Sequence, residues 1–141
     1  WLLEVNTRIS QSHCDLFEKV DGVSHHQVTI DLALGRRPDM PQREGKYPVA
    51  AKFFHRVFFK DATVARTPTD ADVKAVQDAF PGTYVAVQVE NGMRLSDLPE
   101  QDSYSYAVAY IWTGADSHEA LLRQYEEILA RLPFEFTDIE E

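Results

Sequence analysis

The sequence predicts an α+β fold with a mixed or antiparallel sheet and flanking helices, and three observations support this. Apolar and polar residues alternate in 1–10 and 84–90, with the period of two that strands require. Branched and aromatic residues dominate 49–59 and 104–112, a composition typical of strands. Residues 116–131 place apolar side chains at helical spacing, which predicts an amphipathic helix.

Shorter elements are predicted from their boundaries. A short apolar-periodic segment at 16–20 stops at Asp21-Gly22, where the glycine ends the segment. Residues 23–34 form a predicted helix, and Gly35 follows it at the position that favours a left-handed backbone. Asp116 is expected to cap the last helix of the chain.

Local signals also order the middle of the chain. Thr69 followed by Asp72 resembles a capping box with aspartate in place of glutamate, so a helix is expected to begin there. Residues 62–66 are expected to pair back on 49–59 through a turn at Lys60-Asp61. That pairing would form a hairpin inside the second half of the chain.

One loop offers the best candidate for an internal boundary. Residues 36–48 hold three prolines and a glycine, which disfavour regular structure, at Pro38, Pro41, Gly45 and Pro48. We therefore divide the chain into residues 1–35, a loop or linker over 36–48, and a small α+β subdomain over 49–141. The acidic tail from Thr137 is expected to fray.

The composition excludes several classes of partner. The 141 residues carry 23 acidic and 14 basic side chains, a formal charge of -9. Binding to nucleic acid or to an anionic membrane surface needs a basic surface, so neither is expected. The single cysteine, Cys14, cannot form an internal disulfide, which fits the cytoplasm. Because the chain opens at Trp1 inside an apolar run, we expect a preceding N-terminal part of the same protein.

The clearest candidate for a binding or catalytic site is the polar face of the first predicted strand. Glu4, Asn6 and Arg8 alternate along it, and such neighbours lie about 6.6–6.8 Å apart. Carboxylate and amide oxygens so placed suit Mg²⁺. An arginine beside them suits a phosphoryl or carboxylate group. A polar strand face that is merely solvated remains the alternative from spacing alone.

At these residues the chain resembles the C-terminal end of the ATP-grasp domain. The pattern occurs in biotin carboxylases, carbamoyl-phosphate synthetase large subunits and L-amino-acid (dipeptide) ligases. It comprises E-V-N-T-R-I-S at 4–10, D-G at 21–22 and D-L-A-L-G at 31–35. The resemblance continues more loosely downstream, at A-A-K-F-F in 50–54, D-S-Y in 102–104 and T-G-A-D-S-H-E-A in 113–120.

The resemblance implies a C-terminal part of an ATP-grasp fold, with ATP and Mg²⁺ as cofactors. By this resemblance, Glu4 and Asn6 ligate the Mg²⁺ that bridges the ATP phosphates, and Arg8 contacts the acyl phosphate or the substrate. Lys52 occupies the position where many dipeptide ligases have an arginine. His13 follows the Arg8 strand and is expected near the substrate.

The reaction that the resemblance implies is phosphoryl transfer to a carboxylate, followed by attack of an amine on the acyl phosphate. Biotin carboxylases carry a glutamate and a histidine after the arginine, whereas residues 11–14 read Q-S-H-C. This departure favours small-molecule carboxylate and amine substrates over bicarbonate. Because the nucleotide pocket of such enzymes precedes this segment, the chain alone is expected to be inactive. The alternative is a non-catalytic docking or dimerisation module, whose partner could be a second copy of the chain in a homodimer.

The other reactive side chains have simpler interpretations. His25 and His26 point to different sides of a helix and cannot chelate one ion together, and His55 lies within an aromatic strand. Cys14 has no evident base partner for nucleophilic chemistry. The phenylalanines between residues 53 and 59 are expected to pack in the core.

Overall fold

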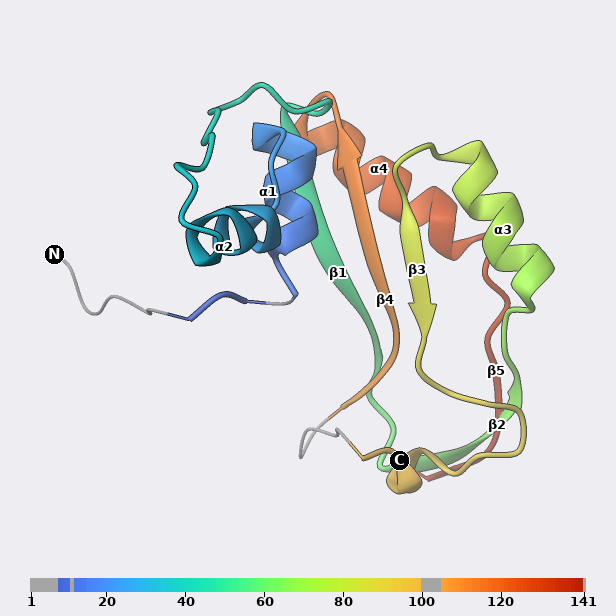
Figure 1. Cartoon of the computed structure of the whole chain (residues 1–141). Helices are drawn as coiled ribbons and strands as arrows, with labels where there is room; N and C mark the ends of the chain where they lie inside the picture. Colours follow the sequence, from blue (N-terminus) through green and yellow to red (C-terminus); the bar gives the residue numbers. More distant parts are fainter. Residues whose placement is uncertain (1–7, 11, 100–104, 141) are drawn as a thin grey trace, which may run out of the picture.

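The computed structural model describes residues 8–10, 12–99 and 105–140. Its centre is an antiparallel three-stranded sheet with the order β1-β4-β3, formed by β1 (Val49–Val57), β4 (Tyr106–Ala115) and β3 (Tyr84–Val87) (Figure 1). β4 pairs on both sides, which explains why most of its residues are buried. The predicted α+β class, with an antiparallel sheet and flanking helices, is confirmed.

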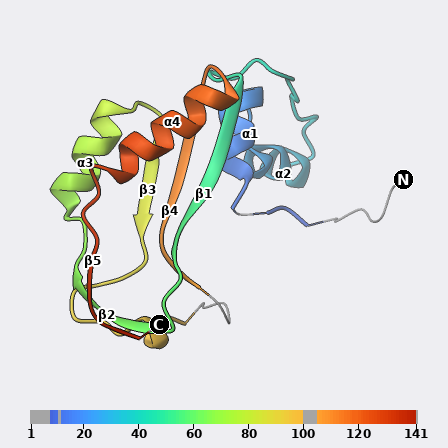
Figure 2. The ribbon, with the colours of Figure 1, turned by 180° about the vertical axis from the view of Figure 1, so that it is seen from behind.

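Helices cover both faces of this sheet. α3 (Asp70–Ala79) and α4 (His118–Leu129) lie on one face, and α1 (Cys14–Asp21) lies on the opposite face (Figures 1 and 2). α2 (His25–Ala33) packs beside α1, away from the strands. The two faces of the sheet therefore have different surroundings.

The apolar core under α3 and α4 follows from the alternation of the strands. Val85 and Ile111 are paired across β3 and β4 and point to the same side, where they meet Val76 of α3 and Ile128 of α4. On the same side, the ring of Phe53 stacks on Tyr125 at 4.1 Å between centroids. This burial of apolar surface is the main force that holds the helices on the sheet.

A second, two-stranded sheet lies below the three-stranded sheet in the view of Figure 1. β2 (Asp61–Arg66) pairs antiparallel with β5 (Glu135–Glu140). Ala62, Val64 and Leu95 form an apolar cluster there, with Leu95 supplied by the short 3₁₀ helix η1 (Leu95–Asp97).

Two expectations about this region are wrong. Residues 62–66 do not pair with 49–59; they belong to β2, whose partner is β5. Residues 137–140 are not frayed but form most of β5, and Glu141 lies outside the described residues. The main chain at Lys60 explains the difference, since its N–H donates to the carbonyl of Glu140 at 2.8 Å instead of closing a hairpin.

The helix boundaries follow the local signals to within two residues. α2 begins at His25 rather than at residue 23, because Ser24 caps it. Thr69 and Asp72 form the predicted capping box, with both reciprocal hydrogen bonds. α1 ends at Asp21, and Gly22 adopts a φ of 92°. The cap of α4 is Ser117 rather than Asp116, because the Ser117 hydroxyl accepts the Ala120 N–H at 3.1 Å.

The loop over 36–48 returns to the sheet beside α1. The Gly45 N–H donates to the Val20 carbonyl, and the Tyr47 N–H donates to the Lys19 carbonyl, both at 3.0 Å. α1 in turn packs on β1 and β4. Among the described residues, none of the helices has the length and apolarity of a membrane span.

Candidate functional site

The residues predicted to form a site are distributed over three places. Glu4 and Asn6, the predicted metal ligands, lie outside the described residues. Arg8 is exposed and precedes the turn that leads into α1, and residues 8–10 are not part of a strand. His13 stands at the N-cap of α1, and Lys52 lies in β1.

Local hydrogen bonds fix the segment around His13. Its Nδ1 lies 2.7 Å from the Ser10 hydroxyl and 3.1 Å from the Ser12 hydroxyl. Cys14, which is 2% exposed, donates its thiol to the Ser10 carbonyl at 3.2 Å. A buried thiol so engaged is a packing group, consistent with an inert cysteine. The turn therefore holds the exposed His13 ring in one arrangement.

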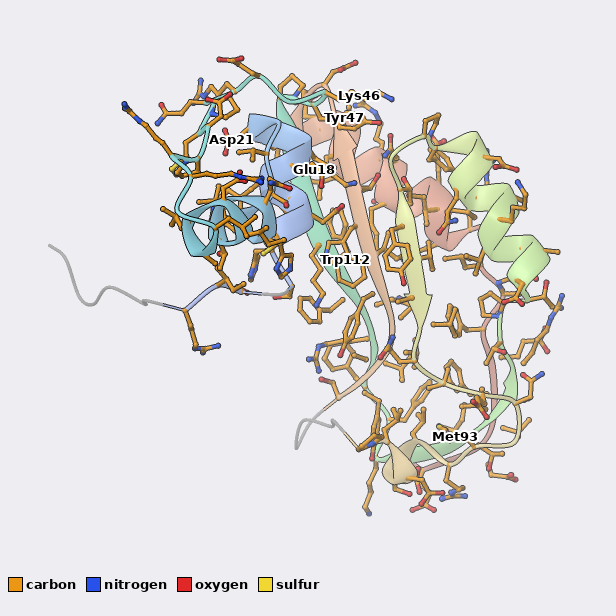
Figure 3. The ribbon with its side chains drawn as sticks, in the orientation of Figure 1. Glu18, Asp21, Lys46, Tyr47, Met93 and Trp112 are labelled. Atoms are coloured by element: carbon orange, nitrogen blue, oxygen red, sulfur yellow. The ribbon has the colours of Figure 1, made fainter. Side chains whose placement is uncertain are left out.

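This segment is attached to the sheet by Trp112. The indole Nε1–H of Trp112 donates to the main-chain carbonyl of Ser12 at 2.9 Å. Trp112 lies near the middle of the sheet, below α1 (Figure 3). This half-buried hydrogen bond restricts the distance between the turn and β4.

Lys52 sits on the same face of the sheet in an aromatic setting. Its ammonium lies 4.5 Å from the ring centre of Phe54, 4.2 Å from that of Tyr110 and 4.7 Å from that of Trp112. The sheet register causes this, because Lys52 pairs with Trp112 and Phe54 with Tyr110. Cation–π contacts are worth about 0.5–2 kcal/mol each, so the position of the ammonium is restrained.

A cavity opens beside this group of rings. It has a volume of about 280 Å³ and is lined by Tyr110, together with Gln88, Leu98, Pro99 and Ala107. Close to it, Arg56 lies 5.7 Å from the ring centre of Phe54 and donates to the Ser105 hydroxyl at 2.7 Å. Two cations thus border one aromatic face, an arrangement that can bind a carboxylate or phosphate.

A separate charged cluster joins β2, η1 and β5. Asp61 accepts hydrogen bonds from the Arg94 guanidinium at 2.6 and 3.0 Å and from Ser96 at 2.9 and 3.0 Å. Arg94 also contacts Glu140 at 2.9 Å. Burial raises the pKa of the Asp61 carboxyl, but these hydrogen bonds outweigh that effect and lower the pKa to about 2. The cluster ties three elements together and is structural.

The remaining histidine and phenylalanine side chains differ in how far they are buried and in what they pack against. His25 stacks on Phe17 at 3.7 Å between centroids, and burial lowers the pKa of His55. Phe53 is packed under α4, whereas Phe54 and Phe58 are 45% and 75% exposed. Within residues 8–10, 12–99 and 105–140, we find no group of three His, Cys, Asp or Glu residues able to hold a metal.

Sequence reasoning missed two residues that organise these sites, Trp112 and Arg94. Each acts through a partner that is far away in the chain, Ser12 and Asp61 respectively. The sequence marks Trp112 only as a strand residue, and no local pattern indicates its role. Comparisons with protein-family models, with curated proteins and with solved structures gave no match.

Proposed function

We propose that the chain is the C-terminal portion of an ATP- and Mg²⁺-dependent carboxylate–amine ligase of the ATP-grasp type. The observation that carries this proposal is the run Glu4, Asn6, Arg8, which leads directly into the turn at His13 that Trp112 anchors beside Lys52. An α+β fold with an antiparallel sheet is compatible with it.

Each residue has a chemical task in this proposal. The oxygens of Glu4 and Asn6 would hold Mg²⁺, which screens the phosphoryl oxygens during transfer to the carboxylate. Arg8 would bind the acyl phosphate with its planar pair of donors, and Lys52 would add a point charge for the substrate. Catalysis of phosphoryl transfer depends chiefly on positioning and on charge stabilisation of this kind.

The ligase would need a further part of the same protein, which supplies the rest of the nucleotide pocket. α2 offers a surface for it. None of its nine residues is buried against the rest of the described chain, and Ile30, Leu32 and Leu34 are 53%, 60% and 59% exposed. Ile30 and Leu34 lie one turn apart on the same side of α2, and exposed apolar side chains grouped in this way mark an interaction surface. In this chain, Ile30→Glu should change stability by less than about 0.5 kcal/mol. In the complete protein it should lower the melting temperature more than Leu122→Glu on α4.

The decisive experiment measures ADP and phosphate release by the complete protein. Release should require both an amino-acid carboxylate and an amine, and Glu4→Gln and Asn6→Ala should each abolish it at an unchanged melting temperature. The matched control is Glu126→Gln, which changes an exposed carboxylate on α4 and should keep full turnover. Unchanged turnover in both site variants would rule the assignment out.

The non-catalytic docking or dimerisation module is the second candidate, and one observation favours it. Phe54, Phe58 and Tyr84 are 45%, 75% and 55% exposed, and aromatic side chains are enriched at protein–protein interfaces. Thermal unfolding separates the two candidates, because a ligand that binds the native state raises the melting temperature. Mg²⁺-ATP should stabilise a ligase, and it should leave a docking module unchanged while ultracentrifugation detects a dimer.

A further inference from the structure

Trp112 touches two groups that the sequence placed in the site independently. Its Nε1–H holds the Ser12 carbonyl at 2.9 Å, next to His13. Its ring centre lies 4.7 Å from the Lys52 ammonium. One side chain therefore sets the separation between the turn that follows Arg8 and the cation on β1.

The surroundings of Trp112 restrict the position and the rotation of its indole ring. Trp112 lies in the central strand β4 and pairs with Lys52 on one side and with Tyr84 on the other. Its ring is flanked by Tyr84 at 5.4 Å and by Tyr110 at 6.1 Å between centroids. Aromatic neighbours on both sides restrict the rotation of the indole, so the direction of its N–H is set by the sheet.

The turn transmits this position to the residues around it. Ser12 and Ser10 both contact the His13 ring nitrogen, and the His13 N–H donates to the Ser10 carbonyl at 3.0 Å. A displacement of the Ser12 carbonyl should therefore displace the His13 ring and the Ser10 hydroxyl that contacts it.

We propose that Trp112 is a positioning residue, which holds the turn at Ser12 and His13 in register with Lys52. The inference rests on the proposed function, because that function makes this register matter for catalysis. Trp112 itself contacts neither the metal nor the reacting atoms in this proposal. It acts through the Ser12 carbonyl, and its loss should weaken metal-dependent turnover without removing any predicted ligand.

The test compares Trp112→Phe with Tyr106→Phe. Tyr106 also lies in β4, and its hydroxyl donates to a main-chain carbonyl, that of Lys60, at 2.7 Å. Each variant removes one donor from the same strand, and Trp112→Phe also removes part of the ring, so its stability should fall by the larger amount. A second variant replaces the indole by benzothiophene, which keeps the ring over Lys52 and loses only the N–H.

Two readouts separate positioning from plain stability. In the first, NMR signals of the His13 ring and of the Lys52 side chain are followed in this chain. Both should shift in Trp112→Phe, the His13 signal should shift in the benzothiophene variant, and neither should shift in Tyr106→Phe. The second readout is the Mg²⁺ concentration that gives half-maximal turnover of the complete protein. It should rise about two- to tenfold, the equivalent of one lost hydrogen bond, in Trp112→Phe and in the benzothiophene variant, and it should not change in Tyr106→Phe.

The proposal is overturned if Trp112→Phe matches Tyr106→Phe in both readouts. It is equally overturned if the benzothiophene variant keeps the native His13 signal and the native Mg²⁺ dependence. If the complete protein shows no ATP-dependent ligation, the proposed function fails. The NMR comparison then still decides whether Trp112 sets the position of the turn.

Discussion

The ring of Tyr47 lies directly against Gly114, near the end of β4. Figure 3 shows Tyr47 at the top of the sheet. The Tyr47 hydroxyl reaches past Gly114 and donates to the carbonyl of Pro81. Because the Tyr47 N–H also binds the Lys19 carbonyl, this one residue connects α1, the top of the sheet and the turn after α3. The contact exists only because position 114 has no side chain.

The first prediction follows from that contact. A Cβ at Gly114 would lie 2.5 Å from Cγ and 2.6 Å from Cδ2 of Tyr47, so the ring must move. Gly114→Ala should therefore destabilise the chain by about 1–3 kcal/mol, the usual range for overpacking. In a Tyr47→Ala background the same substitution should cost close to nothing. Urea unfolding of the four variants measures this, and additive costs would contradict the steric explanation.

The second prediction concerns acid stability at Asp61. Its pKa is about 2 in the folded chain, against 3.8 for an ordinary aspartate. A lowered carboxyl pKa stabilises the fold above pH 3.8, and the contribution disappears as the pH falls through 2. Asp61→Asn should therefore lower the melting temperature at pH 7, and the gap to the natural chain should close between pH 4 and pH 2. A constant gap over that interval would show that the charge of Asp61 is unimportant.

The elements that were predicted correctly are those encoded by neighbouring residues. The capping box of Thr69 and Asp72 needs side chains three positions apart, and the glycine after α1 needs only its own left-handed backbone. The hairpin predicted at Lys60-Asp61 was wrong because the partners of these residues are distant in the sequence. Arg94 bridges Asp61 of β2 and Glu140 of β5, and the Lys60 N–H donates to the Glu140 carbonyl. Such long-range partners leave no periodic signal in the sequence.

The candidate site also has one part that the sequence predicts and one part that depends on the fold. Glu4, Asn6 and Arg8 form a pattern along the chain, so the order of residues alone is enough to select them. The aromatic surroundings of Lys52 depend instead on the register that places Trp112 opposite it. A shift of one residue in that register would turn the rings to the other face. Sequence periodicity predicts strands but cannot fix their register.

The third prediction measures the capping box. Thr69→Ala removes the hydroxyl that accepts the Asp72 N–H at 3.2 Å, and loss of such a cap usually costs about 1 kcal/mol. Lys74→Ala is the control on the same helix, since its ion pair with Asp78 is 72% and 65% exposed and should contribute less than about 0.5 kcal/mol. Equal losses in the two variants, measured by urea unfolding, would mean that the cap does not stabilise α3.

The fourth prediction uses the pH dependence of His55. Burial lowers the pKa of this imidazole below 6.5, so the folded chain favours the neutral ring, which lies 5.3 Å from the ring of Phe134. The unfolded chain takes up the proton first, and stability should be lost as the pH falls from 6.5 through the folded pKa. His55→Phe keeps an aromatic ring and should remove this part of the decline in melting temperature between pH 7 and pH 5.

The control for His55 is His26→Gln. His26 is exposed on α2, so its replacement should leave the decline as it is in the natural chain. Asp61 does not interfere, because its titration lies below pH 4. Differential scanning calorimetry at half-unit intervals of pH resolves the two variants. If His55→Phe and the natural chain lose stability in parallel, the acid sensitivity arises elsewhere. The half-buried imidazole is then protonated as easily in the folded chain as in the unfolded one.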